Sequence, residues 1–197
     1  MRFKEVKGSL FVISAPSGAG KSTLCKAALQ SLPDLRYSIS YTTRSPRSGE
    51  KNGVDYVFID QKEFVEGIKE NRWAEWAMVH DNYYGTSAKD IDRELSAGKN
   101  ILLDIDVQGA QQIIQRYPNA ITIFIMPPDM KELERRLTSR GTDSAQVISK
   151  RLKNAVKEMA QHKMYQYIIV NDQLEASISE LLTIINKTAS NDGSAGK

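Results

Sequence analysis

The sequence predicts an α/β fold, with a three-layer α/β/α core built on a parallel sheet. Short apolar runs without polar alternation recur along the chain, as expected of strands buried on both faces, and helix-compatible segments separate them. A glycine-rich turn also joins the first run to a helix-compatible segment, which is typical of P-loop proteins. The apolar runs cover residues 10–13, 100–106, 120–126 and 167–170.

The first predicted strand, 10–13, leads into a phosphate-binding loop, and a helix is predicted over 21–32 because Pro33 ends it. Backbone N–H groups of such a loop surround a polyphosphate, and the helix directs the positive end of its dipole toward it. Lys21 adds a positive charge, and the Ser22 hydroxyl is a ligand for Mg²⁺ carried by the nucleotide. The loop, which predicts binding of a nucleoside triphosphate such as ATP, comprises Ala15, Pro16, Ser17, Gly18, Ala19, Gly20, Lys21, Ser22 and Thr23.

One position departs from the usual phosphate-loop pattern, which begins with glycine where this chain has Ala15. Alanine fits that position if its φ is negative. An ordinary strand-turn-helix joint is the alternative interpretation. The coincidence of Gly18, Gly20, Lys21 and Ser22 after an apolar strand favours the phosphate loop.

The remaining elements divide the chain into a core with two additions. Short, mixed strands at 37–41 and 56–59 predict an inserted subdomain, and a highly charged helical segment predicts a lid. The strand 100–106 ends in Asp104 and Asp106, and Asp104 is expected to hold Mg²⁺ with Ser22, directly or through water. A simple turn or helix cap is the alternative for these carboxylates. The expected parts are core 8–36, 88–128 and 165–187, insertion 37–87, lid 129–164, and a flexible tail 188–197.

Composition restricts the classes of partner. A net charge of +3 spread along 197 residues favours small anionic ligands over nucleic acid. No apolar run is long enough to span a bilayer and no signal peptide is evident, so a cytoplasmic protein without a membrane partner is expected. The single cysteine, Cys25, is expected to be a buried packing residue. The oligomeric state stays open, a homo-oligomer included.

Short motifs are spread over residues 8–187 of the chain. They are SISYTTRSPRSGE at 38–50, GVDY at 53–56, EW at 75–76, NYYGT at 82–86, LDIDVQG at 103–109, RRLTSRG at 135–141, KRL at 150–152 and IVND at 169–172. In order and spacing these motifs resemble those of the guanylate kinase family. The resemblance implies a core, a GMP-binding insertion and a mobile lid. It also implies in-line transfer of the γ-phosphoryl group of ATP to GMP or dGMP, giving ADP and GDP, with Mg²⁺, in purine nucleotide metabolism and GMP recycling.

The resemblance assigns roles in GMP binding. Glu75 matches the family's guanine reader, since a carboxylate accepts the N1–H and N2–H₂ donors of guanine, whereas adenine would leave it unpaired. Ser40 and Thr86 match the other base-reading positions. The phosphate of GMP is assigned to Arg44, Arg47, Tyr56 and Tyr84, and Asp104 and Asp106 complete the set of GMP-binding residues.

The resemblance also assigns the catalytic and ATP-binding residues. Charge on the transferred group is expected to be stabilised by Lys21, Arg44, Arg136, Arg140 and Arg151, of which the last three belong to the lid. Asn171 and Asp172 match a loop near the adenine.

Two other interpretations were weighed. Non-catalytic guanylate-kinase-like modules use the insertion groove to bind peptides, but they typically lack a working phosphate loop, which this chain keeps. A P-loop kinase acting on a sugar phosphate would need no guanine reader, so Glu75, Ser40 and Thr86 argue against it.

Overall fold

The computed structural model describes residues 8–79, 81–139, 141 and 143–191, without the side chains of 189–191. Its central sheet has five parallel strands in the order β2-β7-β1-β8-β9. β1 lies in the middle and is buried along its length. The strands are β1 (Leu10–Ser14), β2 (Leu35–Tyr37), β7 (Asn100–Asp104), β8 (Ile121–Met126) and β9 (Tyr167–Val170).

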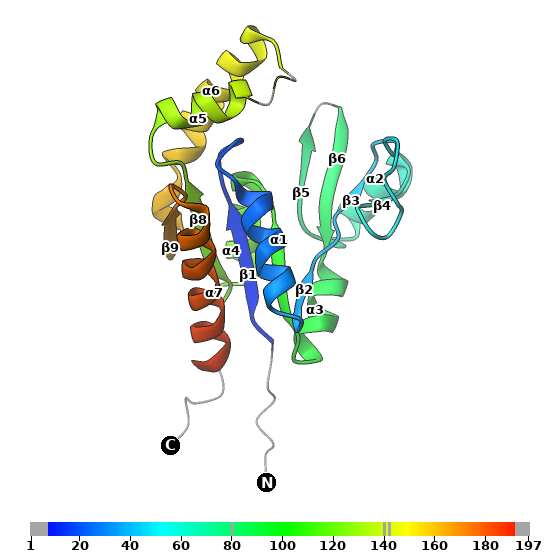
Figure 1. The fold of residues 1–197 in the computed structure, drawn as a ribbon. Helices are drawn as coiled ribbons and strands as arrows, with labels where there is room; N and C mark the ends of the chain where they lie inside the picture. The colour runs from blue at the N-terminus through cyan, green and yellow to red at the C-terminus, as the bar shows by residue number, and fades with distance from the viewer. Residues whose placement is uncertain (1–7, 80, 140, 142, 192–197) are drawn as a thin grey trace.

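Helices cover both faces of this sheet, which confirms the predicted three-layer core (Figure 1). Side chains of β1 alternate between the layers: Phe11 and Ile13 pack with α1 and α7, whereas Leu10 and Val12 pack with α3 and α4. Cys25 of α1 is buried as expected, and burial raises the pKa of its thiol to about 12. The helices are α1 (Lys21–Ser31), α3 (Ala88–Ser96), α4 (Val107–Arg116) and α7 (Leu174–Asn191).

The insertion forms its own four-stranded sheet, in the order β4-β3-β6-β5, with helix α2 (Gln61–Lys69) packed beside it. The predicted strand 37–41 is wrong. Tyr37 ends β2 in the core sheet, Tyr41 begins β3 in the second sheet, and 38–40 carry the chain between them. A short run of strand-forming residues does not specify which sheet it joins. The strands are β3 (Tyr41–Thr42), β4 (Val57–Phe58), β5 (Trp73–Val79) and β6 (Asn82–Ser87).

Another difference concerns the strand predicted over 100–106, which ends at Asp104. The chain turns there because Asp106 is the N-cap of α4, and its carboxylate accepts the backbone N–H of Gly109 at 2.8 Å. The helix-cap alternative therefore describes Asp106 correctly.

The segment predicted to be a lid consists of two helices, α5 (Met130–Ser139) and α6 (Ala145–Met159), followed by a short 3₁₀ helix, η1 (His162–Met164). Leu133, Leu137 and Ala155 form a small core between them. These helices lie beyond the C-terminal ends of the strands of the central sheet, on the same side as the phosphate loop (Figure 1). At the chain's end, α7 extends to Asn191, so 188–191 of the expected tail are helical, and 192–197 lie outside the described residues.

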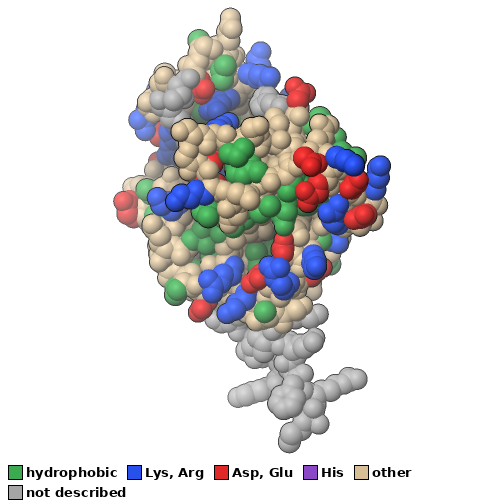
Figure 2. Space-filling view, turned by 90° about the vertical axis from the view of Figure 1, so that its right-hand side faces the viewer, with side chains coloured by type: hydrophobic (Ala, Val, Ile, Leu, Met, Phe, Trp, Pro, Cys, Tyr) green, Lys and Arg blue, Asp and Glu red, His purple; other side chains and the backbone are tan. Residues whose placement is uncertain are grey.

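The outer side of the insertion carries basic and acidic side chains intermixed around hydrophobic ones (Figure 2). Among the described residues, no helix has both the length and the apolar character needed to cross a membrane.

Candidate active site

The phosphate loop connects β1 to α1 and depends on two glycines in the left-handed region, Gly18 at φ 97° and Gly20 at φ 98°. Both sites are also sterically closed. A Cβ on Gly18 would lie 2.9 Å from Leu137 Cδ2 of the lid, and one on Gly20 would lie 2.2 Å from Asn171 Nδ2. Ala15 is buried and is not among the described residues with positive φ, as its fit to the loop requires.

Lys21 is the first residue of α1, and its ammonium group lies at the C-terminal end of β7. Nζ forms an ion pair with Asp104 Oδ1 at 2.7 Å and donates to the Ile105 carbonyl at 2.8 Å. Ser22 and Thr23 follow in the exposed first turn. The structure thus brings the predicted lysine and carboxylate into contact, and Ser22 follows the lysine in the chain.

These oxygens suit a hard cation. Asp104 and Asp106 each have one carboxylate oxygen engaged, by Lys21 and by the Gly109 N–H, and the other makes no hydrogen bond within the described part of the chain. Mg²⁺ typically uses one or two carboxylates together with phosphate oxygens and water. Among the described residues there is no group of three or more His, Cys, Asp or Glu able to hold a metal.

A cavity of about 290 Å³ lies between the insertion and the ends of the core strands. Glu75 of β5 lies at its wall, 6% exposed, and accepts a hydrogen bond of 2.6 Å from the Thr86 hydroxyl on β6. Gly109 allows this approach, because a Cβ there would lie 2.7 Å from Glu75 Oε2. Ser40, Tyr56, Glu75, Ala77, Val79, Tyr84, Asp104, Ile105 and Asp106 line the cavity.

Burial changes the charge state of the Glu75 carboxyl. Desolvation raises its pKa to about 7, the Thr86 hydrogen bond lowers it, and the nearby Asp106 raises it. Near neutral pH the Glu75 side chain is therefore present both as the protonated acid and as the carboxylate, and both forms make hydrogen bonds.

Arg44 is held near this cavity by a residue that the sequence analysis missed as a functional group. Glu50 accepts from both terminal nitrogens of Arg44, at 2.9 and 3.0 Å, and from the backbone N–H of Arg47 at 2.7 Å. The Arg44 guanidinium also stacks over Tyr56, 5.4 Å from the ring centroid, and Tyr56 contacts Tyr84 edge-on. The exposed side chain of Arg47 does not line the cavity. The sequence shows an acidic residue, Glu50, six positions after Arg44, but this spacing alone does not predict that the two side chains form an ion pair.

A second cavity, of about 320 Å³, lies beside the phosphate loop on the side of the lid. Arg136 borders it, and donates to Glu132 Oε1 at 2.7 Å and to the Asn171 carbonyl at 2.9 Å. Arg151 is instead paired with Asp143 at 2.9 Å and does not line this cavity; Arg140 lies outside the described residues. The lining residues are Gly18, Gly20, Thr23, Arg136, Ser139, Asn171, Asp172 and Leu174.

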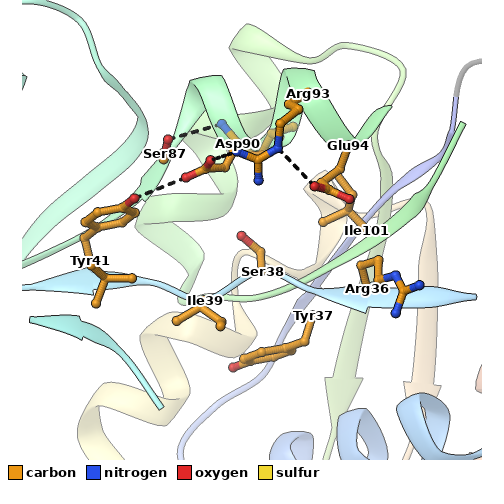
Figure 3. Close-up of a pocket in the computed structure, with 12 residues that line it drawn as sticks. Arg36, Tyr37, Ser38, Ile39, Tyr41, Ser87, Asp90, Arg93, Glu94 and Ile101 are labelled. Carbon is orange, nitrogen blue, oxygen red and sulfur yellow. Dashed lines mark hydrogen bonds and ion pairs between the residues drawn. The ribbon is translucent and has the colours of Figure 1, made fainter. Parts of the chain in front are cut away.

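Another cavity of about 320 Å³, which no sequence motif indicated, lies where the chain passes from the core to the insertion, between α3 and residues 36–41 (Figure 3). The Tyr41 hydroxyl donates to Asp90 Oδ2 at 3.2 Å and so links the insertion to α3. Arg93 in turn donates to Asp90 and Glu94. This cavity borders a connection between parts of the molecule rather than the phosphate loop.

Comparisons with known proteins agree with this architecture. The model of the guanylate kinase family matches residues 7–188. A guanylate kinase of Geobacter sulfurreducens is 48% identical over 179 residues, 91% of this chain and 88% of that protein. One from Shewanella sp. strain MR-7 is 51% identical over 180 residues, 91% of this chain and 87% of that protein. The crystal structure of guanylate kinase from Anaplasma phagocytophilum superposes with a TM-score of 0.75 at 33% identity, covering 94% of this chain and 88% of that one.

Proposed function

This chain belongs to the guanylate kinase family, whose members phosphorylate GMP with ATP, and we propose how its residues divide that work. The phosphate loop and the lid hold ATP, the insertion holds GMP or dGMP, and transfer takes place between them. One observation carries the proposal: the buried carboxylate of Glu75 shares a cavity with Asp104, which forms the ion pair with Lys21 of the phosphate loop.

The donor side acts through positive charge and backbone N–H groups. The loop Ala15–Thr23 surrounds the phosphates of ATP, and Lys21 leaves Asp104 to contact the transferring group. Arg136 is close enough to the loop cavity to contact ATP as the lid closes. Arg140 and Arg151 are assigned to the same role, with Arg151 first breaking its ion pair with Asp143.

The acceptor side recognises guanine by hydrogen bonds. The Glu75 carboxylate accepts N1–H and N2–H₂ of the base, while Ser40 and Thr86 supply hydroxyl groups. Arg44, Tyr56 and Tyr84 bind the GMP phosphate, and Glu50 holds Arg44 for that contact. We also assign Arg47 to the phosphate, which requires its exposed side chain to turn inward.

Transfer is in line and needs no covalent enzyme intermediate, so positioning and charge stabilisation supply the catalysis. Mg²⁺, when bound, neutralises charge on the phosphates, and the free oxygens of Asp104 and Asp106 with the Ser22 hydroxyl are the groups that would hold it, directly or through water. Lys21 and Arg44 stabilise charge on the transferring group, and lid closure excludes water. ATP as co-substrate and a free, buried Cys25 both support a cytoplasmic location.

The test is a coupled ADP-release assay with ATP and magnesium, offering GMP, dGMP, AMP, CMP, UMP and ribose phosphates in turn. We expect release with the guanine nucleotides alone, abolished by chelating the metal. ADP release with a sugar phosphate would identify a sugar phosphate, instead of a guanine nucleotide, as the acceptor. A folded, ATP-binding protein that releases no ADP with any acceptor would instead favour a binding module.

A further inference from the structure

Asn171, which follows β9, makes contacts that differ from those expected of an adenine-binding residue. Its side chain is buried beneath the phosphate loop, and Nδ2 donates to the carbonyl of Ala19 at 2.7 Å. Its backbone is also fixed, because its N–H donates to the Met126 carbonyl at 2.8 Å. The amide donor that could have contacted a base is thus directed into the loop.

This hydrogen bond determines the orientation of one peptide group in the loop. In a trans peptide the C=O of one residue and the N–H of the next point in opposite directions. Because Asn171 binds the Ala19 carbonyl from beneath, the N–H of Gly20 points away from Asn171. Within the described residues that N–H makes no hydrogen bond, so it is available to a phosphate oxygen.

The peptide needs such a fixed partner because glycine allows it to rotate. Gly20 has φ 98°, a conformation with little steric restraint for glycine. A flipped peptide would direct the Ala19 carbonyl, a negative dipole end, toward the phosphates. The close contact of Gly20 with Asn171 Nδ2, 2.2 Å from where a Cβ would lie, leaves little space for other arrangements.

We propose that Asn171 is a positioning residue for phosphoryl transfer, which holds the Ala19–Gly20 peptide so that its N–H faces the phosphates of ATP. The assignment rests on the proposed function, since it names a residue acting on the ATP site. Asn171 is also the residue whose carbonyl accepts Arg136 of the lid at 2.9 Å, so loop and lid are both attached to it.

The test compares Asn171→Ala with Asn171→Asp by calorimetric binding of magnesium ATP and magnesium tripolyphosphate. Aspartate keeps the volume of asparagine, but places a carboxylate against the Ala19 carbonyl and attracts the Gly20 N–H. We expect Kd to rise about tenfold for Asn171→Ala and about a hundredfold for Asn171→Asp, since a preorganised donor to an anion has effects of this size. Both ligands should be affected equally.

Two results would overturn the assignment. A milder effect of Asn171→Asp than of Asn171→Ala would mean that the residue only fills space. A loss confined to ATP, with tripolyphosphate binding unchanged, would make Asn171 an adenine contact. If Asn171→Asp does not fold, the ATP and tripolyphosphate comparison in Asn171→Ala still decides.

The matched control is Asn119→Asp, which makes the same chemical change at an exposed turn. Asn119 lies shortly before β8 begins, and therefore at the opposite end of the parallel strands from the phosphate loop. This variant should bind both ligands as the parent protein does. These measurements require no turnover. Failure of the parent protein to phosphorylate GMP would refute the proposed function, and would be seen separately.

Discussion

The proposed phosphate loop takes its shape from backbone conformation and buried neighbours, whereas the proposed GMP pocket takes its shape from polar and charged side chains that hydrogen-bond to one another. In the loop, Gly18 packs under Leu137 and the Ala19 carbonyl is bound by Asn171. Beside the pocket, Glu50 accepts hydrogen bonds from Arg44, and at the pocket wall the Thr86 hydroxyl donates to Glu75. The loop therefore presents N–H groups that do not titrate, while the pocket contains Glu75, whose pKa of about 7 makes its charge depend on pH.

In the proposed function the two regions bind different substrates. Changes at the loop should act on ATP and on the transfer step, and changes in the pocket should act on GMP. The two regions meet at the strand ends, where Asp104 lines the pocket and pairs with Lys21. Substitutions in either region therefore test whether ATP and GMP are bound separately.

The largest effect is expected for Lys21→Ala, which removes a charge from the transition state. We expect kcat to fall about 10²- to 10³-fold with KM for GMP nearly unchanged, measured by steady-state kinetics. Lys26→Ala, on the exposed side of the same helix, is the control and should keep full activity. A near-normal kcat for Lys21→Ala would show that Lys21 does not stabilise the transition state.

Glu50→Gln should act on the acceptor alone. The amide retains one acceptor for Arg44 but loses the charge and the paired geometry, so Arg44 is held less firmly for the phosphate. We expect KM for GMP to rise about tenfold and KM for ATP to stay constant, an effect of roughly the size of one charge-assisted hydrogen bond. Glu66→Gln, exposed on α2, is the matched control. Tighter GMP binding in Glu50→Gln would mean that Glu50 competes with the phosphate instead of positioning Arg44.

The pH dependence of GMP binding follows from Glu75. Its pKa of about 7 leaves it partly protonated at neutral pH, and the protonated carboxyl cannot accept both guanine donors. The kcat/KM for GMP should therefore rise with pH and level off above pH 7, with a slope of up to about tenfold per unit below it. The same raised pKa affects folding, because the folded protein holds a proton on Glu75 that the unfolded chain has already lost. The free energy of unfolding should therefore fall as pH rises from the unfolded-state pKa of Glu75 toward 7.

Glu75→Gln serves as the control for this profile, because it keeps the titration of the GMP phosphate and removes that of the carboxyl. An identical slope in both proteins would show that Glu75 does not titrate in this range.

The smallest effect is expected at the connection between the core and the insertion (Figure 3). Tyr41→Phe removes the hydrogen bond to Asp90 and should cost about 1 kcal/mol of unfolding free energy, measured by denaturant titration. Tyr37→Phe is the control, since the Tyr37 hydroxyl makes no hydrogen bond among the described residues and lines the same cavity. Equal losses of unfolding free energy in both variants would show that the Tyr41–Asp90 hydrogen bond does not itself stabilise the protein.

The features that the sequence predicts correctly are formed by residues that are neighbours in the chain. The strand, glycines and lysine of the loop are neighbours in the chain, so their pattern predicts the structure directly, and Asp104 follows from the end of a buried strand. The contacts that escaped prediction join distant segments. Asn171 reaches Ala19 across 152 residues, and only the folded chain brings its side chain beneath the loop. The split of 37–41 between two sheets likewise depends on pairing partners, β7 and β6, that no local pattern specifies.

The most direct test of the separation between donor and acceptor regions is calorimetric binding of GMP and of ATP to Glu75→Gln at pH 8, beside the parent protein. At this pH the parent carboxyl is mostly ionised, so the substitution replaces a carboxylate with an amide of the same shape. We predict that Kd for GMP rises at least about tenfold, since a polar site that loses one of its acceptors discriminates strongly, while Kd for ATP stays unchanged. Equal losses for both nucleotides would contradict the account and make Glu75 a structural residue.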